Sequence, residues 1–222
     1  MRLVFVGDGP TDVGPLHDTP HFETSSAAGR VLVRKIIERR VGRKCHFDAK
    51  PRPHRWVSRG GYARKVEVAV AEADADGFDG VVILADRDGP GGHDRLDALK
   101  AGRRAAQART ALPCAVGVAI ETIEAWLLVP SAVKAGLGLE RTPPEPPAPE
   151  TLAGRKGTPT HPKSVLGTWR ADVPEGRFDT VTAVYAAIAE EIDPAALESR
   201  CPAGFAPFAA EVRAEIAPLF ER

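Results

Sequence analysis

The chain has 222 residues, of which 43% are hydrophobic and 27% are charged, and its formal net charge is zero. These are ordinary globular values, which exclude wholesale disorder, and a chain of this length can bury a sizeable core without disulfides. No apolar run approaches the roughly 20 residues of a membrane-spanning helix, which excludes a transmembrane protein.

The first residues, Met1 to Asp8, have the pattern of a strand and lack the long apolar region of a signal peptide. The three cysteines are odd in number and far apart, so the sequence indicates neither a disulfide framework nor a zinc site. We therefore expect a cytoplasmic protein that has no contact with a membrane.

The N-terminal part of the chain alternates between apolar strands and amphipathic helices. Strands are predicted at 2–6, 45–48, 78–85 and 114–120, and helices at 27–41, 62–74, 93–109 and 121–129, the last as a helix or a tight turn. Ser25 or Ser26 is predicted to cap the first helix, and 12–24 and 50–61 are predicted as loops. Strand, helix and strand in alternation predict an α/β fold with a parallel central sheet and right-handed crossovers.

The character of the chain changes after residue 141. A proline-rich segment at 143–149 and a polar loop make 142–162 a predicted linker. Beyond it, helices are predicted at 163–168, 178–191, 194–199 and 206–220. The expected organisation is therefore an α/β domain (1–141), the linker (142–162) and a C-terminal helical extension (163–222).

Charge is distributed unevenly along the chain. Residues 30–65 hold thirteen basic side chains against two acidic ones, whereas 171–222 hold ten acidic side chains against four basic ones. A basic N-terminal part indicates a site for a polyanion such as nucleic acid. The alternative is that the two oppositely charged parts attract each other.

Acidic residues follow three of the predicted strands. Asp8 follows the first strand, Asp86 and Asp88 follow the third, and Glu121 and Glu124 follow the fourth. Because ligands of parallel α/β sheets bind beyond the carboxyl ends of the strands, we expect these carboxylates to lie close together. A cluster of carboxylates repels itself without a cation, and carboxylate oxygens are preferred ligands of Mg²⁺ or Mn²⁺. The sequence therefore predicts either a metal site or strand ends that do not converge.

Other phosphate and hydrolase motifs are absent. The sequence has no Gly-x-x-x-x-Gly-Lys-Ser/Thr segment, no Gly-x-Gly-x-x-Gly after the first strand and no Gly-x-Ser-x-Gly elbow. These absences argue against a P-loop NTPase, a dinucleotide enzyme and an α/β-hydrolase.

Two acidic segments, Asp8-Gly9-Pro10-Thr11-Asp12 and Asp86-Arg87-Asp88-Gly89, resemble those of Toprim domains. Toprim is the Rossmann-like, metal-binding fold shared by topoisomerases, primases and OLD-type nucleases. The chain is also similar to an uncharacterised bacterial family of small Toprim-related proteins, through Glu124-Ala125-Trp126-Leu127-Leu128 and the later Pro162-Lys163. The first acid of that family is usually glutamate, whereas here it is Asp8.

The resemblance implies a metal-dependent nuclease that cleaves DNA or RNA. Asp86 and Asp88 would hold Mg²⁺ or Mn²⁺, joined by Asp8, and Glu124 would complete the ligand set, unless it is a helix-surface carboxylate. Lys163 would neutralise charge on the transferring phosphoryl group, unless it is an ordinary solvated lysine. The basic residues expected to hold the nucleic-acid backbone are Arg55, Arg59, Arg64 and Lys65.

Proteins resembling this family often accompany an ABC- or AAA-type ATPase in phage-defence settings. The resemblance thus implies the effector of a bacterial anti-phage system with an ATPase partner. One alternative is a non-catalytic regulatory module that works with such an ATPase. Another is a metal-dependent phosphatase acting on small nucleotides.

Overall fold

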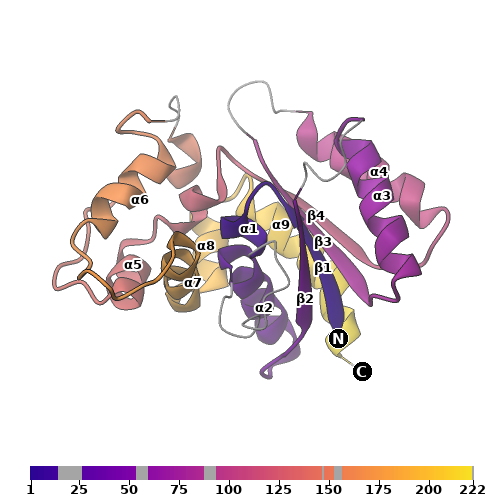
Figure 1. The fold of residues 1–222 in the computed structure, drawn as a ribbon, viewed down its shortest axis with the longest axis horizontal. Coiled ribbons are helices and arrows are strands. Elements are labelled where there is room, and N and C mark those ends of the chain that lie inside the picture. The colour runs from indigo at the N-terminus through magenta and orange to yellow at the C-terminus, as the bar shows by residue number, and fades with distance from the viewer. Residues whose placement is uncertain (15–26, 54–59, 88–93, 147, 153–156, 222) are drawn as a thin grey trace.

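The computed structural model describes residues 1–14, 27–53, 60–87, 94–146, 148–152 and 157–221 (Figure 1). Four parallel strands form one sheet in the order β2-β1-β3-β4. The strands are β1 (Arg2–Gly7), β2 (Asp48–Pro53), β3 (Gly80–Asp86) and β4 (Cys114–Ala119). The predicted α/β class with a parallel central sheet is therefore confirmed.

Helices surround this sheet and make up the C-terminal part of the described chain. They are α1 (Pro10–Val13), α2 (Ala28–Val41), α3 (Tyr62–Ala75), α4 (Arg95–Gln107), α5 (Pro130–Leu137), α6 (Pro162–Arg170), α7 (Val181–Glu191), α8 (Pro194–Arg200) and α9 (Phe205–Glu211). Shorter helical segments are η3 (Ile123–Leu127), η4 (Pro149–Thr151), the π-helical η5 (Val212–Ile216) and η6 (Ala217–Phe220). None of the helices in the described part of the chain combines the length and the apolar character that crossing a membrane requires.

The sheet has an apolar layer on each face, as the continuous apolar run in β3 predicts. On one face, Val4 and Ile83 pack with Val66 and Val70 of α3 and with α4. On the other face, the core is continuous from β1 through α2 to the C-terminal helices α7 and α9. Figure 1 shows α3 and α4 on one side of the strands and α2 on the other. The C-terminal helices therefore complete the core of the sheet.

The second strand lies later in the chain than predicted. We expected a strand at 45–48 and a loop from residue 50, whereas β2 spans Asp48–Pro53 and pairs with β1 along its whole length. The prediction was wrong because two prolines and two basic side chains make this segment read as a loop. At the edge of a sheet, proline is tolerated because one side of the strand has no ladder to donate to.

Three further details of the helices differ from the expectations. Asp12 lies in the short helix α1 rather than in a loop, and α5 was not predicted, although Pro130 occupies its first turn. The N-cap of α2 is Ala27, which supplies no side-chain hydrogen bond. Ser25 and Ser26, the predicted caps, lie outside the described residues.

Two glycines offer a matched test of this packing. A methyl group on Gly117, in the buried strand β4, would overlap the rigid ring of Phe208 from α9. Gly117→Ala should therefore lower the free energy of unfolding by about 1–3 kcal/mol. Gly167, in α6, has open space around its Cα, so Gly167→Ala should raise stability by roughly 0.5–1 kcal/mol. Urea unfolding measures the free energy of unfolding of both variants. Equal changes in the two variants would contradict the packing of Phe208 against Gly117.

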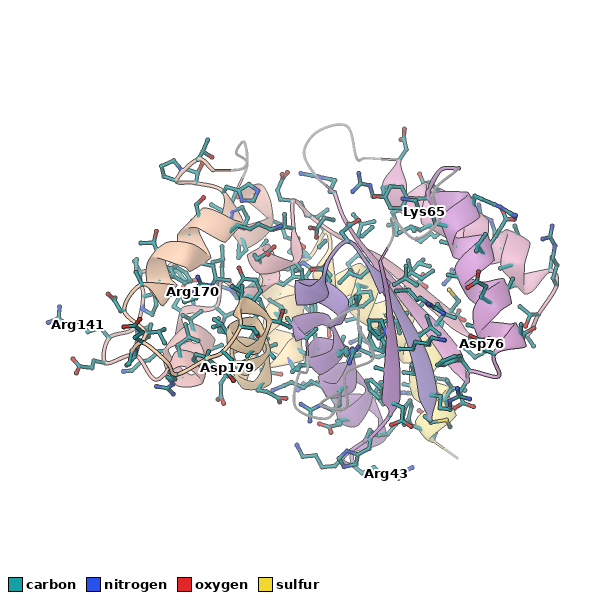
Figure 2. All side chains as sticks on the ribbon, viewed as in Figure 1. Arg43, Lys65, Asp76, Arg141, Arg170 and Asp179 are labelled. Carbon is teal, nitrogen blue, oxygen red and sulfur yellow. The ribbon has the colours of Figure 1, made fainter. Side chains whose placement is uncertain are left out.

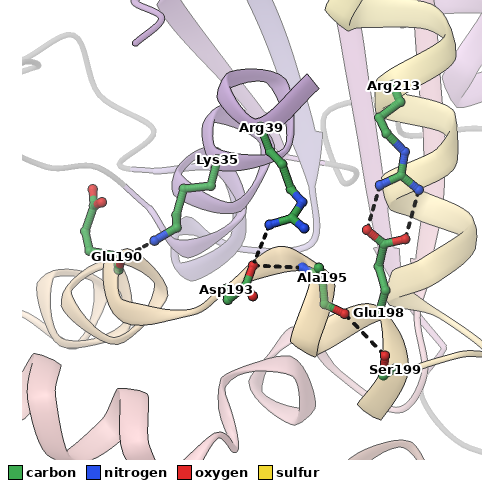
Figure 3. A network of polar contacts seen from close by, with 8 residues as sticks. All are labelled: Lys35, Arg39, Glu190, Asp193, Ala195, Glu198, Ser199 and Arg213. Carbon is green, nitrogen blue, oxygen red and sulfur yellow. Dashed lines mark hydrogen bonds and ion pairs between the residues drawn. The ribbon is translucent and has the colours of Figure 1, made fainter. Parts of the chain in front are cut away.

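The basic helix α2 is neutralised from within the molecule. Arg34 and Lys35 contact the carboxylate and the backbone carbonyl of Glu190, respectively, and Arg39 lies 3.2 Å from Asp193. Figure 3 shows the Lys35 and Arg39 contacts beside the bidentate pair of Arg213 and Glu198. Attraction between the basic and acidic parts of the chain is thus confirmed for this helix. That part of the basic stretch is not an unopposed surface for a polyanion.

Candidate functional site

The end of β3 meets the residues that directly follow β1 and β4 at the carboxyl end of the sheet. Asp8, just beyond β1, accepts a hydrogen bond through Oδ2 from the backbone N–H of Asp86 at 2.7 Å. Asp86, the last residue of β3, accepts through Oδ1 from the backbone N–H of Ile123 at 3.0 Å. Ile123 begins η3, which follows β4. Each carboxylate therefore links two strand ends, and the described strand ends do converge.

Asp12 joins this cluster from α1. It is buried, and its Oδ2 accepts from the Gly9 N–H at 2.9 Å. The sequence analysis did not select Asp12 as a site residue. A signal was available, because Asp12 is the last residue of the segment that resembles the Toprim acidic loop.

Glu124 is the most deeply buried acid of the group, with 2% of its surface exposed. Its Oε1 lies 3.7 Å from Nζ of Lys163, which belongs to the first turn of α6. Its Oε2 is buried and has no hydrogen-bond partner among the residues that the structure describes. A buried charged oxygen without a partner is costly, so this atom has the character of a ligand atom rather than of a solvated surface group.

The pKa of Asp86 is affected by the neighbouring acids. The residue is 6% exposed, and burial is the largest cause of a pKa well above its usual range. The negative charges of Asp12, Glu124 and Asp8 raise the pKa of Asp86 further, in that order. The positive charge of Lys163 lowers it. Four carboxylates thus repel one another at one end of the sheet, and among the described residues Lys163 acts against them.

The C-terminal helices also reach this end of the sheet. Tyr185 of α7 is buried, and burial together with the charges of Glu124 and Asp12 raises its pKa to about 12, while Arg170 lowers it. Tyr185 therefore keeps its proton at neutral pH and offers a neutral hydroxyl beside the acids. Nothing in the sequence indicated Tyr185, because only the tertiary packing of α7 brings it here.

The remaining acid, Glu121, has a different contact. Its Oε1 lies 2.5 Å from Nη2 of Arg87, so it pairs with a cation and is not directed into the carboxylate group. Its φ angle is +63°, which is uncommon for a residue other than glycine.

The predicted nucleic-acid residues are only partly described. Asp88, Arg55 and Arg59 lie outside the described residues. Arg64 forms an ion pair with Glu67 one turn along α3, and Nζ of Lys65 lies 4.8 Å from the centre of the Tyr62 ring. Figure 2 shows Lys65 near the start of α3, at the end of the molecule to which the strands run.

The donor set fits a hard divalent cation in its chemistry. Asp8 and Asp86 each use one oxygen in the backbone bonds above, which leaves their other oxygens, with Glu124 Oε2, as donors. Oxygen-only donors suit Mg²⁺ or Mn²⁺. Among the described residues, no three His, Cys, Asp or Glu side chains are already arranged around one metal position.

Comparisons of the chain with family models, with curated proteins and with solved structures found no match.

Proposed function

We propose that the protein is a divalent-metal-dependent nuclease that hydrolyses phosphodiester bonds of DNA or RNA. The observation that carries the proposal is the convergence of Asp8, Asp86 and Glu124 from three strand ends, with a buried, unpartnered oxygen on Glu124. Mutual repulsion at such a cluster is relieved by a bound cation. The Toprim resemblance of the two acidic segments supports the same reading.

The residues divide into ligands and charge-neutralising groups. Asp8, Asp86 and Glu124 would hold Mg²⁺ or Mn²⁺ through carboxylate oxygens. Asp88 belongs to the same proposed set of ligands. When bound, such an ion polarises the scissile phosphate and lowers the pKa of a bound water. Lys163, with its side chain 38% exposed and its Nζ beside Glu124, is placed to stabilise negative charge on the phosphoryl oxygens.

The substrate contacts are part of the same proposal. Arg64 and Lys65, at the start of α3, would bind the phosphate backbone, together with Arg55 and Arg59. Asp8 stands where the family that the chain resembles usually has glutamate, and its shorter side chain already reaches the Asp86 N–H. The role as an anti-phage effector beside an ATPase is what the Toprim resemblance implies.

Asp8→Asn gives the sharpest test of the proposal. The asparagine would keep an oxygen that accepts from the Asp86 N–H, and Asp8 is exposed, so we expect normal folding. Cleavage of plasmid DNA, single-stranded DNA and total RNA would be measured with Mg²⁺ or Mn²⁺ and with EDTA. We expect metal-dependent cleavage by the wild-type protein and a fall of about 10²–10³-fold in the variant.

The matched control is Asp76→Asn. Asp76 follows α3 at the end away from Lys65 (Figure 2). It pairs with Lys50, so this variant should cleave like the wild type. Cleavage that persists in EDTA, or in Asp8→Asn, would contradict the proposal. Turnover of a small phosphomonoester without cleavage of nucleic acid would favour the phosphatase instead. Inactivity on every substrate would favour the regulatory module.

A further inference from the structure

Three contacts beside the acid cluster tie the end of β3 and Arg87 to the end of β4 and the segment that follows it. The Asp86 carboxylate accepts from the Ile123 N–H at 3.0 Å, and the Arg87 N–H donates to the Ala119 carbonyl at 2.9 Å. The third contact is the ion pair of Arg87 with Glu121. The first contact fixes η3, and therefore Glu124, relative to Asp86.

Glu121 lies at the centre of the tight turn between β4 and η3. The Thr122 N–H donates to the Ile120 carbonyl at 3.0 Å, which closes a three-residue turn around Glu121. A positive φ at the centre of such a turn is the rare, strained form. The turn reverses the chain between β4 and η3, so that Ile123 and Glu124 return toward Asp86.

Glutamate is an uncommon residue at a positive φ angle. Glycine or asparagine adopts a positive φ with little strain, whereas glutamate does so only where its surroundings hold it. Glu121 is buried, and its carboxylate is held by Arg87, which directly follows Asp86. Strain of this kind persists where surrounding contacts over-determine it, and it gathers at functional sites.

We infer that Glu121 is a positioning residue, which holds the turn through Arg87 so that Ile123 stays bonded to Asp86 and Glu124 faces the acid cluster. The inference deepens the proposed function and rests on it for the identity of the metal site. Glu121 therefore has a different role from the proposed ligand Glu124, although both residues follow β4.

The test compares two substitutions of Glu121 with a distant ion pair. Glu121→Gly removes both the carboxylate and the strain, whereas Glu121→Asp keeps a carboxylate on a residue that tolerates positive φ. Glu198→Gln weakens the Arg213 pair, which joins α8 to η5 and includes no residue of the acid cluster. Each variant would be examined by amide hydrogen exchange, by thermal melting and by Mn²⁺ titration.

If Glu121 is a positioning residue, its replacement should have a local effect. In Glu121→Gly, the Ile123 amide should exchange at least tenfold faster while the amides of β1 stay protected, and the melting temperature should not fall. Mn²⁺ should bind about 10–100-fold more weakly, the usual cost of losing a group that orients a ligand. Glu121→Asp should restore part of both properties. Glu198→Gln should leave Ile123 exchange and Mn²⁺ affinity unchanged.

Unchanged Ile123 exchange in Glu121→Gly would overturn the inference. A lower melting temperature with faster exchange throughout the sheet would overturn it too, because Glu121 would then have a merely structural role. Failure of the wild-type protein to bind Mn²⁺ would contradict the proposed function. The exchange of Ile123 would still decide whether Glu121 positions the turn.

Discussion

Replacing Asp86 with asparagine should lower the proposed metal-dependent cleavage and should make the metal-free protein more stable. Asparagine keeps an oxygen that accepts from the Ile123 N–H and removes one charge from the carboxylate group. Activity should fall on the order of 10²–10³-fold. The free energy of unfolding should rise by about 1 kcal/mol, which is roughly 2–4 °C in melting temperature for a chain of this size.

The gain in stability should depend on pH. The pKa of Asp86 is raised in the folded protein above its ordinary value of 3.8, by burial first and by neighbouring charges second. Between these two values the folded protein holds a proton that the unfolded chain has released. Wild-type stability therefore falls as the pH rises from about 4 through the raised pKa of Asp86. The variant lacks this loss of stability, so its advantage over the wild type should be small near pH 4 and should grow as the pH rises.

Thermal melts in EDTA at several pH values measure this effect. Asp79→Asn is the matched control, because Asp79 immediately precedes β3 at its opposite end and accepts from the Arg2 N–H at 2.6 Å. That variant should show no gain at neutral pH. The same difference between Asp86→Asn and the wild type at pH 4 and at neutral pH would show that the charge of Asp86 is not the cause.

Glu150→Ala will cause the largest loss of stability. The Glu150 carboxylate is buried and accepts four hydrogen bonds, from Nε1 of Trp126 and from the backbone N–H groups of Ala203, Gly204 and Phe205. Alanine would leave these donors without a partner, at about 1–3 kcal/mol for each one that stays buried. We expect a loss of about 4 kcal/mol or more, a large part of the total stability of a domain.

Denaturant unfolding of Glu150→Ala and Glu150→Gln checks this prediction. Glutamine keeps one acceptor oxygen but turns an NH₂ group toward N–H donors, so its loss should lie between those of the wild type and of alanine. Glu145→Gln, also in the proline-rich region, breaks an exposed ion pair with Arg200 and should cost under about 1 kcal/mol. A loss below about 1 kcal/mol for Glu150→Ala would contradict the assigned role.

Glu150 also shows where sequence patterns stop being informative. A proline-rich stretch is typical of a linker, and 142–162 was predicted as one, yet Glu150 anchors η4 to the start of α9. Its three backbone partners lie more than fifty residues along the chain, and Trp126 lies 24 residues before it, so no local pattern encodes these contacts. The same reason hid the place of Tyr185 beside the acids.

The central strands and their acids were predictable for the opposite reason. The run Val81-Val82-Ile83-Leu84 is apolar because both faces of β3 are covered, and Asp86 follows it where a parallel sheet presents its ligand-binding end. The edge strand β2 has no such run. The positive φ of Glu121 was equally hidden, because glutamate carries no local signal for that conformation.

The packing of Phe208 against Gly117 has a consequence for the order of events during synthesis. The face of β4 that carries Gly117 is completed by α9, a segment translated long after the strand itself. Contacts between segments so distant in sequence form slowly, since a long loop must close before they contribute. A nascent chain that still lacks α9 will therefore expose an apolar strand on the ribosome, where it is open to chaperones and to aggregation.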